Sequence, residues 1–267
     1  MSEVRMHVVR AGRFRRKSDG KSIQRFRCRR CLRYFSRATF SPCYRQNKRR
    51  LNHEVYEHLA SEVSQRRSAR LLRCNRKTIA KKFKFVALRC QADLESQNKL
   101  LPKAKIVEFD ELETIEHSKC KPLSVLVAVN ENRKFLVLKV CRMPAKGRLA
   151  KIALKKYGPR VDERPRGRKL FFESLKQFVE PTALFKSDEN PFYPKDLLKA
   201  FPRATHQRFK GQRGSTTGQG ELKRVRFDPL FKLNHSCAML RANINRLIRK
   251  TWCTTKIPEN LALHLAI

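Results

Sequence analysis

The sequence predicts an α/β protein, in which a mixed sheet with flanking helices follows two smaller N-terminal segments. Three observations predict this fold class. From residue 101 onward, apolar runs of strand length alternate with amphipathic helical patterns, the order expected for a sheet covered by helices. Residues 47–100 show apolar side chains at helical spacing, and residues 1–46 show short alternating runs separated by turn residues. We therefore expect three parts, at residues 1–46, 47–100 and 101–267.

The chain carries a large excess of positive charge. Its 267 residues include 63 Lys and Arg against 23 Asp and Glu, a formal net charge of +40 with a pI near 10.8. Such a chain repels itself unless a polyanion neutralises it, so nucleic acid is the expected partner. No apolar run approaches the ~18–20 residues of a membrane-spanning helix. The basic segments also lack the apolar face that an interfacial helix needs, so no membrane partner is expected.

The first part is predicted to be a small zinc-ribbon-like segment. Asp19-Gly20 lies between two alternating runs, which favours a β-hairpin. Cys28 and Cys31 follow with the two-residue gap of a metal knuckle. A Zn²⁺ site needs four ligands, and the second cysteine pair usual for this fold is missing upstream. His7 and Cys43 could complete the site; the alternative is a ribbon fold that has lost its metal.

The second part is predicted to be a helix-turn-helix domain. Apolar residues recur every four positions from Leu51 to Val63, a short helix then ends at a turn at Cys74-Asn75, and another helix spans residues 76–88. The second helix of such a pair enters the DNA major groove, whereas a plain three-helix bundle is the alternative. Residues 89–103 are expected to form the linker. The candidate DNA-binding residues of this helix are Arg76, Lys77, Lys81 and Lys82.

The third part is predicted to contain five strands. They are expected at residues 105–110, 122–129, 134–140, 182–188 and 205–209, with the second and third antiparallel. Helices are expected at residues 170–179 and 195–200, and a long final helix should begin at Asp228-Pro229 and carry a buried stripe to Leu247. The intervening Gly-, Ser- and Thr-rich residues 211–220 lack the lysine ending of a phosphate-binding P-loop and suggest a DNA-facing or active-site loop.

Two carboxylates end predicted strands of this sheet. Asp110 ends the first and Asp188 ends the fourth, and ligands of open α/β sheets bind at the carboxyl ends of strands. Oxygen ligands of this kind suit Mg²⁺, and two ions would stabilise both the attacking and the leaving oxygen of a phosphodiester. Glu111 and Glu189, beside the two aspartates, are expected to support the ligands. The sequence therefore predicts a two-metal site at this sheet edge.

These motifs carry a resemblance to a known family. Phe109-Asp110-Glu111, Lys186-Ser-Asp188 and the stretch from Leu233 to Trp252 resemble bacterial insertion-sequence transposases of the RNase H-like superfamily, especially those with a zinc ribbon and helix-turn-helix in front. The catalytic signature of that family is Asp, Asp and a third ligand, commonly Glu, on a C-terminal helix. The resemblance covers nearly the whole chain.

The resemblance also implies a third ligand. In the family a basic residue follows this ligand by seven positions on the same helix face, which assigns Asn234 if the basic residue is Arg241. An amide oxygen coordinates Mg²⁺ without charge and holds the second ion less tightly than Glu. The alternatives are His235, Glu221 and Asp228. Contacts with DNA phosphates are expected from Arg241, Arg246 and Arg249.

The function that the resemblance implies is DNA transposition. The chain would bind the terminal repeats of a mobile element and target DNA as double strands, and would cut and rejoin them with two Mg²⁺ ions, for which Mn²⁺ can substitute. A homodimer or higher oligomer is implied because two DNA ends must be paired. Nine cysteines in a chain without a signal-like apolar stretch favour a reducing compartment, the cytoplasm, and the resemblance implies a bacterial one with association to the nucleoid. The alternative is a catalytically weakened, transposase-derived DNA-binding protein; a ribosomal-type RNA-binding protein fits less well.

Overall fold

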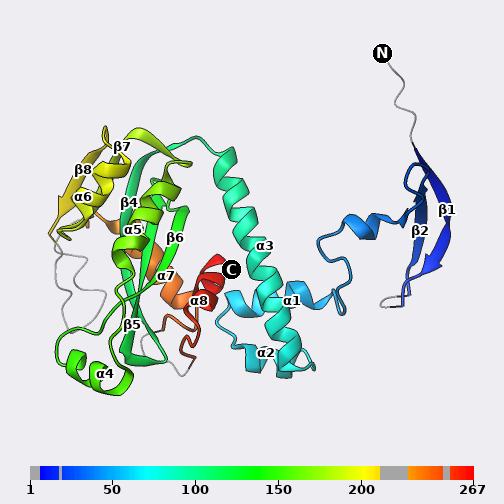
Figure 1. Ribbon diagram of the computed structural model, residues 1–267, viewed down its shortest axis with the longest axis horizontal. Coiled ribbons are helices and arrows are strands. Elements are labelled where there is room, and N and C mark those ends of the chain that lie inside the picture. The colour runs from blue at the N-terminus through cyan, green and yellow to red at the C-terminus, as the bar shows by residue number, and fades with distance from the viewer. Residues whose placement is uncertain (1–6, 18–19, 211–227, 249–252) are drawn as a thin grey trace, which may run out of the picture. The chain divides into compact units, whose positions relative to one another are not determined.

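The chain forms two compact units, residues Met1–Glu54 and Val55–Ile267 (Figure 1). The computed structural model describes residues 7–17, 20–210, 228–248 and 253–267. The helices predicted for residues 47–100 group mostly with the sheet, so the described chain separates at a single point rather than two. The expected three-part division therefore stays a prediction.

The N-terminal unit is a small antiparallel sheet followed by one helical turn. Its strands β1 (Val8–Arg15), β2 (Ser22–Cys28) and β3 (Tyr34–Phe35) lie in the order β1-β2-β3, and β1 pairs antiparallel with β2 as the hairpin signal predicts. The 3-10 turn η1 (Arg37–Phe40) follows. Three aromatic rings join the sheet to this turn: Phe26 stacks on Phe35 at 5.7 Å, and Phe35 meets Phe40 edge-on at 5.5 Å.

Three helices follow, in the order that the sequence predicts. They are α1 (Leu51–Ala60), α2 (Gln65–Leu71) and α3 (Arg76–Leu100), and in the second unit they enclose a core that includes Val55, Ile79 and Phe83. Asn75 caps α3, because its side-chain oxygen accepts a hydrogen bond from the Lys77 backbone N–H at 2.8 Å.

The linker predicted at residues 89–103 is wrong over most of its length, because α3 continues without a break to Leu100. No Gly or Pro interrupts this stretch before Pro102. Two i,i+4 ion pairs, Arg89–Asp93 at 3.4 Å and Lys99–Glu95 at 2.6 Å, also favour helix. Near the end of α3, the buried Asn98 side chain donates to the Phe135 carbonyl at 3.0 Å and ties the helix to the sheet.

The second unit contains a mixed five-stranded sheet. Its strands are β4 (Ala104–Glu116), β5 (Ser118–Asn130), β6 (Phe135–Arg142), β7 (Val179–Asp188) and β8 (Thr205–Phe209), in the order β6-β5-β4-β7-β8. The first three are antiparallel, as predicted for β5 and β6, while β7 and β8 run parallel to β4. The class predicted from the sequence, α/β with a mixed sheet and flanking helices, is thus observed.

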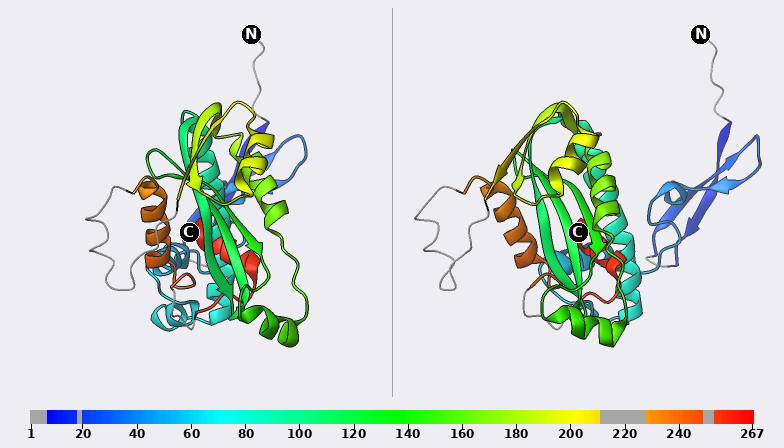
Figure 2. Two further views of the ribbon diagram at one scale, coloured as in Figure 1. Left: turned by 90° about the vertical axis from the view of Figure 1, so that its left-hand side faces the viewer. Right: turned by 60° about the vertical axis from the view of Figure 1, so that its left-hand side comes forward.

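Helices cover both faces of this sheet (Figure 2). On one face α5 (Arg164–Leu175) and α6 (Tyr193–Ala200) pack on a core that includes Phe109 and Phe185. On the other, α7 (Phe231–Asn243) and α8 (Pro258–Ala266) cover the apolar face of β5. A Cβ at Gly167 in α5 would collide with the Cys141 sulfur, so only glycine permits this close approach of α5 to β6.

The C-terminal helix α8 joins the sheet to the helical part of the second unit. The His264 ring stacks on Phe83 of α3, with ring centroids 4.2 Å apart, and Leu263 and Ile267 pack against the same helical core. The helices of residues 55–100 therefore share a core with the C-terminus. None of the described helices is both long and apolar enough to cross a bilayer.

Several predicted element boundaries are wrong. The helix expected at residues 170–179 begins earlier, at Arg164, where Pro165 suits the first turn, and it ends at Leu175 so that Val179 can open β7. The final helix begins at Phe231 rather than directly after Asp228, and it ends at Asn243. The loop predicted at residues 211–220 lies outside the described residues.

Candidate metal centre and nucleic-acid interfaces

Asp110 and Asp188 lie on neighbouring parallel strands. The last register pair between β4 and β7 is Glu108 with Lys186, so two further positions along each strand bring Asp110 abreast of Asp188. The sequence predicted that Asp110 ends its strand, and this is wrong. Strand β4 continues to Glu116, paired with β5. Asp110 lies where parallel pairing with β7 ends, and there the two carboxylates share one edge.

Asp110 is held by two hydrogen bonds. One carboxylate oxygen accepts from the Glu111 backbone N–H at 2.6 Å and from the Tyr193 hydroxyl at 3.2 Å. Tyr193 is fully buried at the start of α6, and burial together with the charges of Asp110, Glu111 and Asp188 raises the pKa of its phenol. The phenol therefore stays protonated and acts as a donor that orients Asp110.

Burial, and after it the negative charge of Asp188, together raise the pKa of Asp110 to about 7. The two hydrogen bonds oppose this shift without cancelling it. Two neighbouring carboxylates that repel each other in a partly dry setting are stabilised by a cation between them. The electrostatics of this sheet edge therefore suit a hard divalent cation with oxygen ligands.

Glu108 is a second carboxylate on this face of β4, and the sequence analysis missed it. Its side chain is 3% exposed, and its carboxylate accepts the backbone N–H of Leu233 in the first turn of α7 at 3.0 Å. Acidic groups stabilise helix N-termini, whose backbone N–H groups lack helical partners. The signal was present in the sequence, because Glu108 and Asp110 are two residues apart and so share a face of the strand.

The structure does not bring Asn234 into contact with the two aspartates. Its side chain is exposed and donates to the Asp228 carboxylate at 2.8 Å. Asp228 itself accepts the Leu230 backbone N–H at 2.9 Å, and the ring of His235 lies against Phe231. Among these third-ligand candidates, Asp228 and Asn234 thus pair with each other at the start of α7.

Cys237 lies on α7 one turn beyond Asn234, and the charge of Asp110 affects the pKa of its thiol. Burial, and after it the charge of Asp110, together raise the pKa of the Cys237 thiol to about 11. Within the described residues, no three His, Cys, Asp or Glu side chains gather closely enough to hold a metal ion. Glu221, the remaining third-ligand candidate, lies outside the described part of the chain.

Glu111 points to the opposite side of β4 from Asp110. It accepts from Ser124 at 2.8 Å and lies 3.6 Å from the guanidinium of Arg168 on α5, which also donates to Asp196 of α6 at 2.6 Å. Arg168 is only 5% exposed, so this group links β4, α5 and α6 beneath the aspartate pair. Glu189 is exposed and takes no part in it.

The predicted zinc knuckle has its two thiols together. Hydrogen bonds from the backbone and the thiol of Cys31 lower the pKa of Cys28, and the His7 carbonyl accepts the Arg29 N–H at 2.6 Å beside them. Cys43 instead accepts a hydrogen bond from Asn52 at 3.4 Å. The described residues supply no third ligand, so Zn²⁺ binding stays a prediction.

The basic residues predicted to contact DNA differ in exposure. On α3, Arg76, Lys77 and Lys81 are exposed, whereas Lys82 is 5% exposed. Lys82 is buried because residue 82 lies on the same helix face as Ile79 and Val86, which are buried. Its contact with DNA stays a prediction.

The three arginines predicted near the C-terminus also differ. Arg241 is partly exposed on α7, in the turn that follows Cys237. Arg246 is half-buried and donates to the Thr254 carbonyl at 2.9 Å, so it serves the fold and is poorly placed for a phosphate. Arg249 lies outside the described residues.

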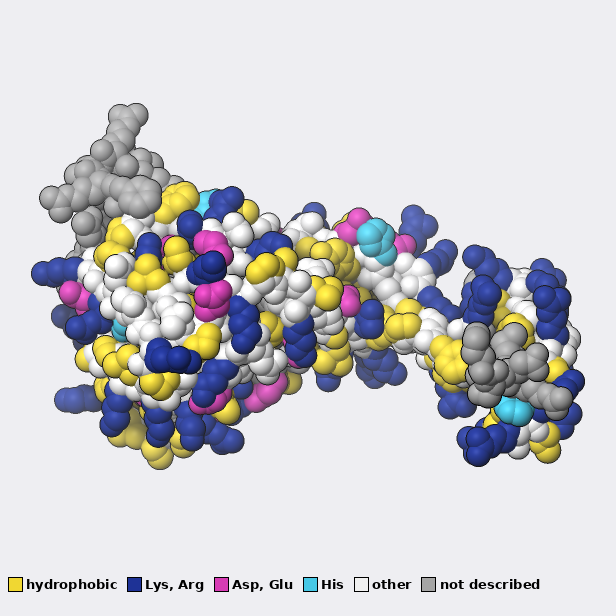
Figure 3. Space-filling model, turned by 90° about the horizontal axis from the view of Figure 1, so that it is seen from above, with side chains coloured by type: hydrophobic (Ala, Val, Ile, Leu, Met, Phe, Trp, Pro, Cys, Tyr) yellow, Lys and Arg dark blue, Asp and Glu magenta, His cyan; other side chains and the backbone are white. Residues whose placement is uncertain are grey.

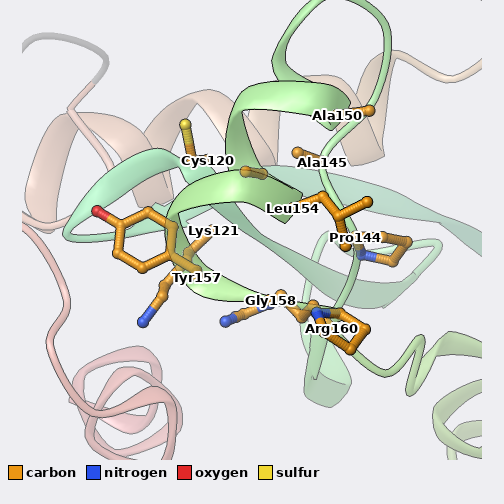
Figure 4. Close-up of a pocket in the computed structure, with 11 residues that line it drawn as sticks. Cys120, Lys121, Pro144, Ala145, Ala150, Leu154, Tyr157, Gly158 and Arg160 are labelled. Atoms are coloured by element: carbon orange, nitrogen blue, oxygen red, sulfur yellow. The ribbon is translucent and has the colours of Figure 1, made fainter.

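A cavity of about 390 Å³ lies beside α4 (Leu149–Tyr157), lined by Lys121, Leu154, Tyr157 and Arg160 among others (Figure 4). Lys121 lies at the far end of β5, next to Pro122, which pairs with Ile115, whereas Asp110 pairs with Val127. The cavity is therefore remote from the aspartate pair and is not part of that site.

Comparison with protein-family models finds no match to this chain, and comparison with curated proteins finds none either. The sequence motifs and the geometry of Asp110 and Asp188 are therefore the observations that bear on its function.

Proposed function

We propose that the protein is a DNA transposase with an RNase H-like core, which binds the ends of a mobile element and catalyses Mg²⁺-dependent cleavage and strand transfer. The observation that carries the proposal is the placement of Asp110 abreast of Asp188, with the pKa of Asp110 raised to about 7 by burial and by its neighbour. The mixed sheet, with three antiparallel strands followed by two parallel ones, is compatible with that core.

In this proposal, Asp110 and Asp188 hold the metal ions and the chain positions the DNA. Two bound Mg²⁺ ions would supply Lewis-acid stabilisation of the attacking and leaving oxygens during phosphodiester cleavage and rejoining. Tyr193 orients the Asp110 carboxylate through its hydroxyl, and Glu108 fixes the start of α7 beside the site. The exposed basic side chains of α3, namely Arg76, Lys77 and Lys81, would contact duplex DNA.

Asn234 and Asp228 share the proposal's third-ligand position. Their mutual hydrogen bond at the start of α7 makes them one polar group, and both can supply oxygen to a cation. The proposal requires that the start of α7 bring this polar group closer to Asp110 when metal and DNA are bound.

The test uses a plasmid carrying the two DNA segments that flank the gene, incubated with the full-length protein and Mg²⁺ or Mn²⁺. The wild type should nick and join these ends, whereas Asp110→Asn and Asp188→Asn should lose roughly a thousandfold or more of the rate while still binding the DNA in EDTA. Asp93→Asn removes an exposed carboxylate from α3 and should leave the rate unchanged. Undiminished cleavage by Asp110→Asn would refute the assignment.

A second candidate function is a non-catalytic DNA-binding protein derived from a transposase. One observation favours it: Asn234 is exposed and bonded to Asp228 rather than directed at the aspartates. This candidate predicts that the wild type shifts the flanking DNA in a gel yet yields no nicked product with either metal.

A further inference from the structure

A second basic surface lies in the N-terminal unit, apart from the residues assigned to DNA above. It is a groove of about 770 Å³ formed by β1, β2, η1 and the segment before α1. Ile23 and Phe26 contribute apolar atoms to its lining. Five arginines also line it: Arg10, Arg13, Arg16, Arg37 and Arg49.

The backbone of β1 brings two of these arginines to one side. In a regular strand, residues 10 and 13 would point to opposite faces. The β1–β2 register shifts between Arg10 and Arg13, and Gly12 within the shift has φ +80°, a backbone conformation that glycine adopts without strain. This irregularity turns Arg13 to the side of Arg10, where its guanidinium donates to the Ser22 hydroxyl at 3.0 Å.

Arg37 reaches the groove from a different element. It opens η1, which is held to the sheet by the contacts of Phe35 with Phe26 and Phe40. The turn is closed by the Thr39 hydroxyl, which accepts the Ser36 backbone N–H at 3.1 Å. The arginines of the groove thus come from three separated segments that the fold brings together, and they are not one basic run along the chain.

Within the described residues, the charges of Arg10 and Arg37 in the groove are not neutralised by neighbouring acids. Between His7 and His53 the described residues include no Asp or Glu. Within the described part of the chain, Arg10 and Arg37 are exposed and make no ion pair. On the N-terminal unit, at the right of Figure 3, Lys and Arg side chains are visible and acidic ones are not, whereas the rest of the molecule mixes both.

Such an array matches the chemistry of a sugar-phosphate backbone. Each guanidinium presents a planar set of donors that can bind a phosphate through two hydrogen bonds. Duplex DNA carries about one charge per 1.7 Å of its axis, and each phosphate that is neutralised releases counterions. A rigid duplex offers these charges at regular spacing to a groove built on a sheet, whereas an acidic peptide would have to be ordered first.

We propose that this arginine groove is a separate DNA-binding site, which holds the phosphate backbone of a double-stranded DNA without reading its sequence. It goes beyond the function proposed above because it needs neither the aspartates nor helix α3. It gives the N-terminal unit a role of its own, to hold duplex DNA by charge, and this role does not depend on zinc.

The experiment measures binding of the full-length protein to a fluorescent DNA duplex of arbitrary sequence in EDTA, over a range of salt concentrations. The double variant Arg10→Gln/Arg37→Gln should make the slope of log affinity against log salt shallower by roughly 1.8, about 0.9 for each lost phosphate contact. The control Arg30→Gln/Arg33→Gln removes the same charge from exposed positions outside the groove and should change the slope by less than half as much.

Equal changes in both double variants, or no change in the groove variant, would overturn the proposal. So would an effect of the groove variant that is seen with single-stranded RNA or polyglutamate but not with duplex DNA. If the glutamine variant fails to fold, Arg10→Lys/Arg37→Lys decides: the slope should stay the same because the charge is kept, while affinity should fall several-fold because lysine cannot bind a phosphate through two donors. Unchanged affinity in the lysine variant would also show that the groove does not bind DNA as proposed. Since the assay contains no divalent metal, its result is independent of strand cleavage.

Discussion

Burial shifts the pKa of two titratable side chains in this molecule, Asp110 and His264, with different consequences. Asp110 has its pKa raised to about 7 by burial and by Asp188, which lies abreast of it on the neighbouring strand. His264 is 4% exposed, and burial, helped by the charge of Arg246, lowers its pKa to about 3. A cation would only add to the positive charge that this site disfavours. His264 therefore stays neutral, and its ring packs against Phe83.

The pKa of His264 predicts acid sensitivity. A histidine whose folded pKa lies below its unfolded value of about 6.5 takes up a proton only on unfolding, so stability is lost as pH falls below about 6.5. Between pH 8 and pH 5 this group should cost on the order of 2 kcal/mol in the free energy of unfolding. His264→Phe, which keeps the ring but cannot be protonated, should remove that loss in urea unfolding, and His117→Phe at an exposed position should not. A wild type and His264→Phe with the same pH dependence would show that His264 titrates normally.

Single residues of the site differ in how well the sequence predicts them. The side-by-side placement of Asp110 and Asp188 was predictable because each follows an apolar run of strand length, although β4 continues beyond Asp110 to Glu116. Glu108 and Tyr193 were not predicted, since their roles depend on what α7 and α6 bring against β4. The burial of Lys82 was not predicted, because it follows from the position of residue 82 on the buried face of α3 and not from its charge.

At the level of elements, the contact between β4 and α7 positions the Asn234–Asp228 pair, which belongs to the proposed metal site. Glu108 is the acceptor that fixes the first turn of α7, and the Asn234–Asp228 pair belongs to the same turn. Strands were predicted well because their apolar runs are continuous and β5 is buried along much of its length. The predicted linker failed because polar residues with i,i+4 ion pairs form helix as readily as loop, and the tertiary contact of Asn98 favours the helix.

Replacement of Glu108 should loosen α7. Glu108→Ala leaves the Leu233 N–H without an acceptor in a buried setting and should lower the free energy of unfolding by about 2–4 kcal/mol. Glu108→Gln keeps an acceptor oxygen and should cost less. Glu113→Ala, on the same strand, breaks only an exposed pair with Lys146 and should cost about 1 kcal/mol or less. Urea unfolding of the three variants compares them, and equal costs for Glu108→Ala and Glu113→Ala would remove Glu108 from its helix-capping role.

For the whole molecule, net charge was the most informative property of the sequence, and the arrangement of its parts was the least. A charge of +40 predicts a polyanionic partner without showing where such a partner would bind. The arginine groove depends on a strand irregularity at Gly12 and on three separated segments, which no linear pattern reveals. The shared core of α3 and α8 likewise joins residues from opposite ends of the second unit.

The central claim is that Asp110 and Asp188 together bind a divalent cation that serves DNA cleavage. Anomalous diffraction from crystals grown with Mn²⁺ and duplex DNA at slightly alkaline pH, where Asp110 is ionised, tests it most directly. The account predicts an anomalous peak within about 2.3 Å of carboxylate oxygens from both aspartates, absent in crystals of Asp188→Asn. Well-ordered crystals in which the two carboxylates share no ion, while Mn²⁺ occupies other sites, would contradict it.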